Sequence, residues 1–156
     1  MSSKIGAIAE RLGTTVRTLR FYEEQGLVHP RRSPGGTRRY DAEDEARFAA
    51  LLALTRLGFS LERLALLAGV RPGSDTGDAA SREVASQLRA MDLELQQQAE
   101  AIAEQRADIA RAQTFLAGCH GCTRRPVRTE CDGCAVSAGR DGIAVLRVVW
   151  DERRHD

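Results

Sequence analysis

The clearest pattern along the chain is a repeat of mostly apolar positions, in alternating steps of four and three, over residues 81–116. No Pro or Gly interrupts the segment, and the spacing is that of a heptad seam, so it predicts one long helix. The seam positions are Val84, Leu88, Met91, Leu95, Gln98, Ile102, Gln105, Ile109, Ala112 and Leu116. Because the chain holds no second heptad segment, we expect a coiled-coil homodimer, with an intramolecular helical hairpin as the alternative.

Two shorter amphipathic patterns precede this segment. Residues 4–12 and 16–25 are each expected to form a helix, with Gly13 ending the first and Thr14 or Thr15 capping the second. Two short helices joined by a tight glycine turn are typical of a helix-turn-helix unit, whose second helix can enter a DNA major groove.

A two-stranded hairpin is predicted after the second helix. Residues 27–30 are extended, because the residue before Pro avoids helical geometry, and Ser-Pro-Gly-Gly at 33–36 forms a turn. Residues 37–40 then return as the second strand. The hairpin is flanked by Arg31, Arg32, Arg38 and Arg39. Such a basic wing can approach a phosphate backbone closely, since glycine carries no side chain.

Charge points to a polyanionic partner for this part of the chain. Residues 1–40 carry eight Lys or Arg against three Glu, a net charge of +5, whereas residues 81–116 carry four Arg against six acids, or −2. Further helices are expected over residues 42–57 and 60–69. An arginine can fork onto guanine, and hydroxyls can contact phosphate or a base edge. The predicted helix over residues 16–25 therefore offers four candidate DNA contacts: Arg17, Thr18, Arg20 and Tyr22.

Four strings in this region resemble the winged-helix DNA-binding domain of the MerR family of bacterial transcription regulators. They are IGAIA at 5–9, VRTLRFYEEQGL at 16–27, GTRRY at 36–40 and LGFSLE at 57–62. The resemblance covers residues 4–116. It implies a homodimer with antiparallel long helices, which bends and untwists an overlong promoter spacer so that RNA polymerase can use it.

The resemblance also implies roles for individual residues. Arg17 and Thr18 match the recognition helix, and Arg20 and Tyr22 match residues that reach phosphate or base edges. Arg38 and Tyr40 match positions that hold the wing to the DNA backbone, with Arg39 between them. Thr37 departs from the pattern, because an aromatic residue is common there, and we expect a weaker wing contact at this position.

All four cysteines lie within 16 residues, in the pattern C-x2-C-x8-C-x2-C. In a reducing compartment such pairs indicate metal or redox chemistry, and four thiolates suit a tetrahedral metal. Arg124, Arg125 and Arg128 are expected to favour the thiolate form, and His120 is expected to be a loop residue. The predicted ligands are Cys119, Cys122, Cys131 and Cys134.

The identity of the metal stays open between alternatives. We expect Zn²⁺ first and a [2Fe–2S] cluster second, and soft ligands also accept Cu(I), Cd²⁺ or Hg²⁺. The SoxR-type members of the family hold a cluster with a tighter cysteine spacing, which this chain lacks. The spacing of Cys122 and Cys131 resembles the mercury, zinc and copper sensors of the family. Several divalent-metal members of the family add a cysteine from the start of the partner's long helix. The corresponding residues 77–81 contain no cysteine here.

The expected protein is therefore mainly α. It has a winged helix-turn-helix domain at 1–70, a hinge at 71–80, a dimerisation helix at 81–116 and a Cys-rich effector tail at 117–156. Apolar, β-branched residues 143–150 predict a strand or extended segment. No catalytic constellation is visible, so we do not expect an enzyme; thioredoxin-like redox chemistry would need a βαβ scaffold. No apolar run suggests a membrane span or signal segment, and we expect a cytoplasmic protein.

Overall fold

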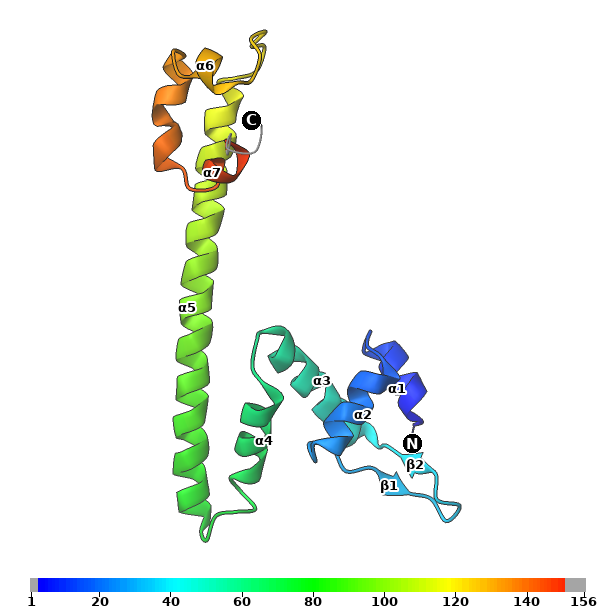
Figure 1. Ribbon diagram of the computed structural model, residues 1–156. Coiled ribbons are helices and arrows are strands. Elements are labelled where there is room, and N and C mark those ends of the chain that lie inside the picture. Colours follow the sequence, from blue (N-terminus) through cyan, green and yellow to red (C-terminus); the bar gives the residue numbers. More distant parts are fainter. Residues whose placement is uncertain (1–2, 151–156) are drawn as a thin grey trace. The chain divides into compact units, whose positions relative to one another are not determined.

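The structure is a computed structural model that describes residues 3–150, and it is mainly helical with a small two-stranded wing, as predicted (Figure 1). These residues form two compact units that divide between Asp92 and Leu93, inside the longest helix. The elements are α1 (Ile5–Arg11), α2 (Val16–Glu24), β1 (Arg31–Arg32), β2 (Arg38–Arg39), α3 (Ala42–Arg56), α4 (Leu61–Gly69), α5 (Gly77–Ala117), α6 (Arg128–Cys131), the 3₁₀ helix η1 (Ala135–Gly142) and α7 (Leu146–Val149).

Local side-chain caps set the starts of α2 and α4 in the first unit. The Thr15 hydroxyl accepts the Thr18 backbone N–H at 3.1 Å and caps α2, after Gly13 has turned the chain with a φ of +60°. Ser60 caps α4 by accepting the Arg63 N–H at 3.2 Å. The expected boundaries of α1 to α4 are thereby confirmed to within about two residues.

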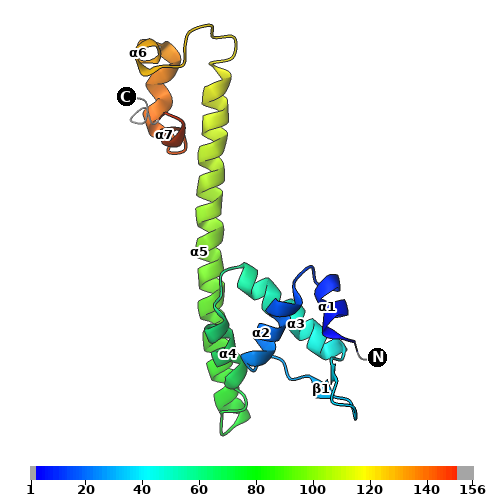
Figure 2. The same ribbon diagram turned by 45° about the vertical axis from the view of Figure 1, so that its right-hand side comes forward.

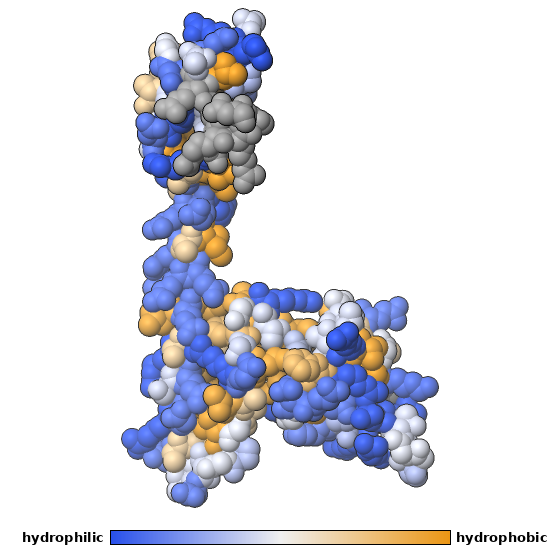
Figure 3. Space-filling model, in the orientation of Figure 1, coloured by the Kyte–Doolittle hydropathy of each residue, from blue (hydrophilic) through white to orange (hydrophobic). Residues whose placement is uncertain are grey.

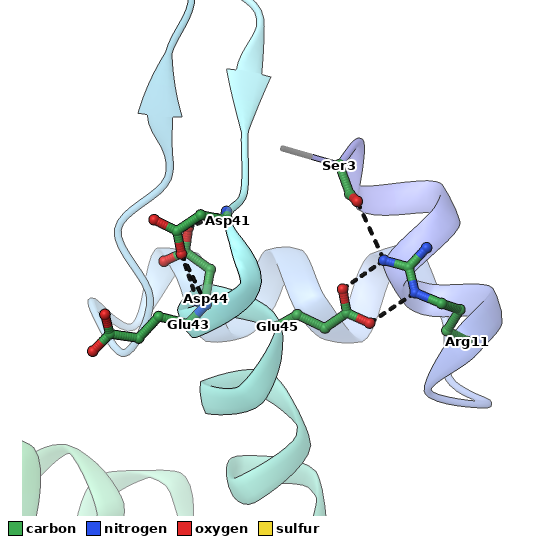
Figure 4. Close-up of polar contacts among 6 residues, drawn as sticks. All are labelled: Ser3, Arg11, Asp41, Glu43, Asp44 and Glu45. Carbon is green, nitrogen blue, oxygen red and sulfur yellow. Dashed lines mark hydrogen bonds and ion pairs between the residues drawn. The ribbon is translucent and has the colours of Figure 1, made fainter. Parts of the chain in front are cut away.

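The start of α3 is fixed by a reciprocal capping box. The Asp41 carboxylate accepts the backbone N–H groups of Glu43 and Asp44 at 3.0 Å, and the Asp44 carboxylate accepts the Asp41 N–H at 3.0 Å (Figure 4). Nearby, the Arg11 guanidinium binds both carboxylate oxygens of Glu45 in a forked ion pair, with its Nε 2.7 Å from one oxygen. This pair joins the end of α1 to the first turn of α3.

A compact apolar core holds α1, α2 and α3 together, and Figure 2 shows the wing extending from this group of helices. Fully buried side chains come from each part: Ile8 from α1, Leu19 from α2 and Phe48 from α3. The ring of Tyr40, just after β2, lies 5.7 Å from the ring of Phe48 and is also fully buried. Truncating Phe48 to Ala would cost about 3–5 kcal/mol, as for other buried aromatic residues.

The wing pairs Arg31 with Arg39 and Arg32 with Arg38 in antiparallel register. The first strand was predicted at residues 27–30, but the structure has it directly after them, at Arg31–Arg32. Leu27 and Val28 are buried in the core of the first unit instead, because two adjacent apolar side chains gain more from burial than from an exposed hairpin edge. A bridge between Ser3 and Tyr40 extends the pairing beyond β2.

Helix α5 is 41 residues long and begins at Gly77, four residues before the predicted start at Ser81. The Thr76 hydroxyl accepts the Ala79 N–H at 3.1 Å, so the cap lies inside the segment expected to be a hinge. Several seam residues are uncovered: Leu88 is 50% exposed, Ile102 60% and Ile109 47%. Apolar residues interrupt the largely hydrophilic surface of α5 in the view of Figure 3. None of the helices described over residues 3–150 is long and apolar enough to cross a membrane.

The tail folds back on the last turns of α5, so the predicted strand at 143–150 is wrong. The segment instead forms α7, whose buried Leu146 packs with Ile143 and with Ala112 of α5. An isolated strand would leave its backbone groups unpaired. Here the backbone N–H groups of Ala144 and Val145 donate to the Asp108 carboxylate at 3.1 and 2.7 Å, and helical hydrogen bonds follow.

This packing also shortens the exposed part of the predicted seam. Ala112 is buried, and Phe115 and Leu116 are partly buried against the same tail cluster. The Phe115 and Trp150 rings meet edge to face, with centroids 6.0 Å apart. The apolar tail of the same chain therefore covers Ala112 and partly covers Leu116, the last two seam positions.

Candidate DNA-binding face and cysteine cavity

Helix α2 presents the predicted recognition residues to different degrees. Arg17 is exposed, and Thr18 is half-buried with its hydroxyl 2.9 Å from the Thr15 hydroxyl. The cap interaction fixes the first turn, so Arg17 projects from a well-defined helix start. A guanidinium in this position is available for a base edge or a phosphate.

Glu23 joins the recognition helix to the wing. Its carboxylate accepts hydrogen bonds from Arg38 Nε at 2.5 Å, from the Tyr40 hydroxyl at 2.8 Å and from Arg20 at 3.2 Å. The Glu23 side chain is only 13% exposed, whereas those of Arg20 and Arg38 are 35% and 40% exposed. One largely covered carboxylate thus orients two arginines predicted to contact DNA.

The electrostatics of this cluster follow from burial and hydrogen bonding. Burial alone would raise the pKa of Glu23, but the hydrogen bonds from Tyr40 and Arg38 and the charges of Arg38 and Arg20 outweigh it. The pKa of Glu23 therefore lies below its ordinary value. Burial and the bond to Glu23 raise the pKa of Tyr40 to about 12, so Tyr40 remains a neutral hydrogen-bond donor.

The two tyrosines among the predicted contacts lie in the interior of the first unit. Tyr22 is 4% exposed and its hydroxyl is 3.0 Å from the Thr55 hydroxyl, while Tyr40 is fully buried. Their hydroxyls are engaged within the protein, where they position α2 and the wing. The sequence analysis missed Glu23; its signal was an acid three residues after Arg20 within a basic segment.

The remaining wing arginines differ in their partners. Arg31 is exposed and lies 3.6 Å from the Asp41 carboxylate, and Arg32 is also exposed. Arg39 is half-buried. A surface pair such as Arg31–Asp41 contributes little to stability, so its guanidinium remains available to an anion.

The second site is a cavity of about 680 Å³ in the tail, lined by all four cysteines. The first pair is closed by a turn in which the Cys122 N–H donates to the Cys119 carbonyl at 3.1 Å, with Gly121 at a φ of +79°. In the second pair, the Cys134 N–H donates to the Cys131 carbonyl at 2.9 Å. The structure thus brings the predicted ligands around one cavity as two turns.

The thiols are near one another but do not converge. Among residues 3–150, no three His, Cys, Asp or Glu side chains are close enough to form a metal-binding group. Burial raises the pKa of the Cys131 thiol, and the charges of Cys122, Cys134 and Cys119 raise it further. The cation that opposes these effects is Arg140, which the sequence analysis did not single out. The donor types fit a thiophilic metal, whose binding would draw the two turns together.

The apolar walls of the cavity come from the end of α5 and from the folded-back tail. Phe115 and Leu116 of α5 line it with Val136, Val149 and Trp150. Gly118 lets η1 approach closely, because a Cβ there would lie 3.1 Å from Val136. The same tail is held at its far side by Asp108, which also accepts a hydrogen bond from Arg111 at 2.8 Å.

Comparisons with known proteins agree with this arrangement. A family model described as MerR HTH family regulatory protein matches residues 3–68. The chain is 30% identical over 145 residues to the mercuric resistance operon regulatory protein of Shigella flexneri, with 90% of each chain covered. It is 39% identical over 72 residues to the HTH-type transcriptional regulator ZntR homolog of Haemophilus influenzae, covering 46% of this chain and 53% of that relative. A solved structure described as a MerR family transcriptional regulator from Listeria monocytogenes has a TM-score of 0.64 at 26% identity, covering 76% of this chain and 88% of that one.

Proposed function

Because this chain belongs to the MerR family of DNA-binding transcription regulators, we propose that it is a homodimer that distorts a promoter spacer when its four cysteines bind a thiophilic metal. The observation that carries the proposal is the cavity lined by Cys119, Cys122, Cys131 and Cys134. The cavity lies at the end of the long helix, so a bound metal would lie beside the predicted dimer seam. The regulator would act in the cytoplasm, on promoter DNA and with RNA polymerase.

The DNA-binding part of the proposal rests on α2 and the wing. Arg17 would read base edges, while Arg20, Arg38 and Arg39 would contact phosphates, with Thr18 at the start of the same helix. Tyr22 and Tyr40 would act by positioning these elements, because their hydroxyls already bind Thr55 and Glu23. Leu88, Ile102 and Ile109, all about half-exposed or more, support a partner helix on α5.

The metal part of the proposal rests on the donor set. Four thiolates suit Zn²⁺, our first expectation, and equally suit Hg²⁺, towards which the name of the relative from Shigella flexneri points. A bound metal would supply a charge that holds four thiolates together and displaces their protons. The residues Cys119, Cys122, Cys131 and Cys134 would hold it, and the turn at Gly121 would let the first pair close.

The test is metal binding and promoter output for each of the four single Cys→Ser variants. Each variant should lower the metal bound per protomer and abolish the transcriptional response, while DNA affinity is largely retained. His120→Ala, within the same loop, is the control and should behave like the unmodified protein. Silent behaviour at both Cys119 and Cys134 would reduce the site to Cys122 and Cys131.

The visible spectrum of protein purified without air identifies the group that is bound. A colourless protein with one Zn²⁺ or Hg²⁺ per site supports the divalent-metal proposal. A red-brown protein bleached by reductant would replace it with the [2Fe–2S] alternative.

A further inference from the structure

The cysteine cavity is larger and more apolar than a bare metal ion requires. A tetrathiolate ion is enclosed by sulfurs at about 2.3 Å and needs no further space. The cavity of about 680 Å³ instead falls within the range of pockets for small organic molecules. Its walls include Phe115, Val136, Val149 and Trp150. The space beside the thiols therefore fits an organic group attached to the thiophilic centre.

The grouping of the thiols indicates how many of them such a centre would use. Cys119 and Cys122 share one turn, and Cys131 and Cys134 share another, while no three metal-ligating side chains converge among the described residues. A central atom that binds the two thiolates of one turn and also carries one organic substituent would fit this cavity, because the substituent could lie against the apolar wall. Trivalent arsenic carrying an aryl group has this valence.

We propose that the cavity binds an aryl-substituted trivalent arsenical, with arsenic on one cysteine pair and the aryl ring against Phe115, Val149 and Trp150. This inference rests on the proposed thiol site and names a class of effector for it. In the binding step two As–S bonds replace the arsenic–oxygen bonds. The two thiol protons leave with oxygen as water, and arsenic remains trivalent, so no oxidant or reductant is needed.

The aromatic pair supplies the specificity. Phe115 and Trp150 already meet edge to face, with centroids 6.0 Å apart, and an aryl ring can extend that arrangement. Burying a ring of this size should strengthen binding by about tenfold or more over a centre without it. Trp150 is the only tryptophan in the chain, so its fluorescence reports directly on an occupant of the cavity.

The experiment titrates the reduced full-length protein with phenylarsine oxide and with methylarsonous acid, following Trp150 fluorescence and the mass of the adduct. Dithiothreitol is the reference dithiol, because it has the same sulfur chemistry and no apolar wall. The protein should prefer the phenyl compound over the methyl compound at least tenfold more strongly than dithiothreitol does. Equal preferences would overturn the proposal.

Two neighbouring valines provide a matched pair of variants. Val149 lines the cavity and is 65% exposed, whereas Val148 is absent from its lining and is 81% exposed. Val149→Asp should remove most of the phenyl preference, and Val148→Asp should retain it. Equal effects of the two substitutions would refute the assigned wall.

Failure of this inference is distinguishable from failure of the proposed function. A protein that binds Zn²⁺ or Hg²⁺ through its cysteines and responds at the promoter, but shows no phenyl preference, would sink only the aryl pocket. A protein whose cysteines bind neither a metal ion nor either arsenical would refute both.

Discussion

Replacing Glu23 by Gln tests whether one largely covered carboxylate sets the DNA selectivity of this regulator. Glu23 accepts hydrogen bonds from Arg38, Tyr40 and Arg20, at 2.5, 2.8 and 3.2 Å. Glutamine keeps one oxygen that can accept from the buried Tyr40 hydroxyl, but it removes the charge that binds the two arginines. The substitution therefore separates the charge of Glu23 from its role as a hydrogen-bond acceptor.

The expected cost in stability is modest and follows from exposure. Arg20 and Arg38 are 35% and 40% exposed, so water screens both ion pairs and each contributes at most about 1 kcal/mol. Glu23→Gln should then lower the free energy of unfolding by about 1–2 kcal/mol. Glu23→Ala should cost about 2–4 kcal/mol, because it also leaves the buried Tyr40 hydroxyl without its acceptor.

The effect on DNA binding should be separate from this loss of stability and similar to it in free energy. Arg20 and Arg38 would no longer be oriented by Glu23 and could contact phosphates of any sequence. The salt dependence of binding to non-specific DNA should therefore steepen by up to about 0.9 per additional phosphate. Affinity for the specific promoter should fall, because the wing is no longer held to α2. The ratio of specific to non-specific affinity should therefore drop by about tenfold, measured by titration at several salt concentrations.

Glu24→Gln is the matched control, since it changes the same charge on the adjacent, exposed residue of α2. It should leave the specificity ratio and the salt slope of the protein nearly unchanged. If Glu23→Gln and Glu24→Gln altered both quantities equally, net charge alone would explain the result and the positioning role of Glu23 would be refuted.

Three further predictions concern the seam, the recognition helix and the tail. Ile102→Asp should abolish the dimer in analytical ultracentrifugation together with specific DNA binding, at several kcal/mol for an unpaired charge in an apolar interface; an intact dimer would refute the seam. Arg17→Ala should weaken promoter binding by about 1–3 kcal/mol and relax sequence preference, and equal loss on all sequences would assign Arg17 to phosphate instead. Asp108→Asn should accelerate amide exchange at Ala144 or Val145, because these N–H groups donate to different carboxylate oxygens and Asn keeps only one of them; unchanged exchange would refute the anchor. Hydrogen bonds from Val145 and Ala144 outweigh burial and lower the pKa of Asp108 below its ordinary value of 3.8. The stability that ionised Asp108 gives the folded tail is therefore complete above pH 3.8 and should be lost only as the pH falls below 3.8.

The parts of the fold that sequence could predict are those fixed by local contacts. Thr15, Asp41 and Ser60 cap their helices through backbone N–H groups two or three residues away, and such contacts are encoded by spacing alone. The heptad pattern likewise predicted α5. Its start was missed because the Thr76 cap lies in a Pro- and Gly-containing loop, whose composition favoured a longer hinge.

The parts that sequence could not predict depend on contacts between distant residues. Asp108 lies 36 residues before Ala144, whose backbone N–H it accepts, so the pattern of the tail alone suggested a strand. Tyr22 and Tyr40 had the residue type of phosphate contacts, but their partners Thr55 and Glu23 are 33 and 17 residues away. The gathering of the four cysteines at one site could be predicted from their spacing. The apolar walls of the cavity could not, because they form only when the tail folds back on α5.

The folded tail ties the state of the cysteine cavity to the end of the dimer seam. Phe115 and Leu116 line the cavity and also pack against the cluster that buries Ala112, the seam position one turn earlier on α5. Asp108 anchors the same tail beside Ile109, the last seam residue that remains strongly exposed. Because closely packed side chains cannot shift independently, an occupant that displaces Phe115 or Trp150 must also change how Ala112 and Leu116 are covered. The proposed metal binding at the cysteines and the length of seam available to the proposed partner helix would therefore be linked through one small apolar cluster.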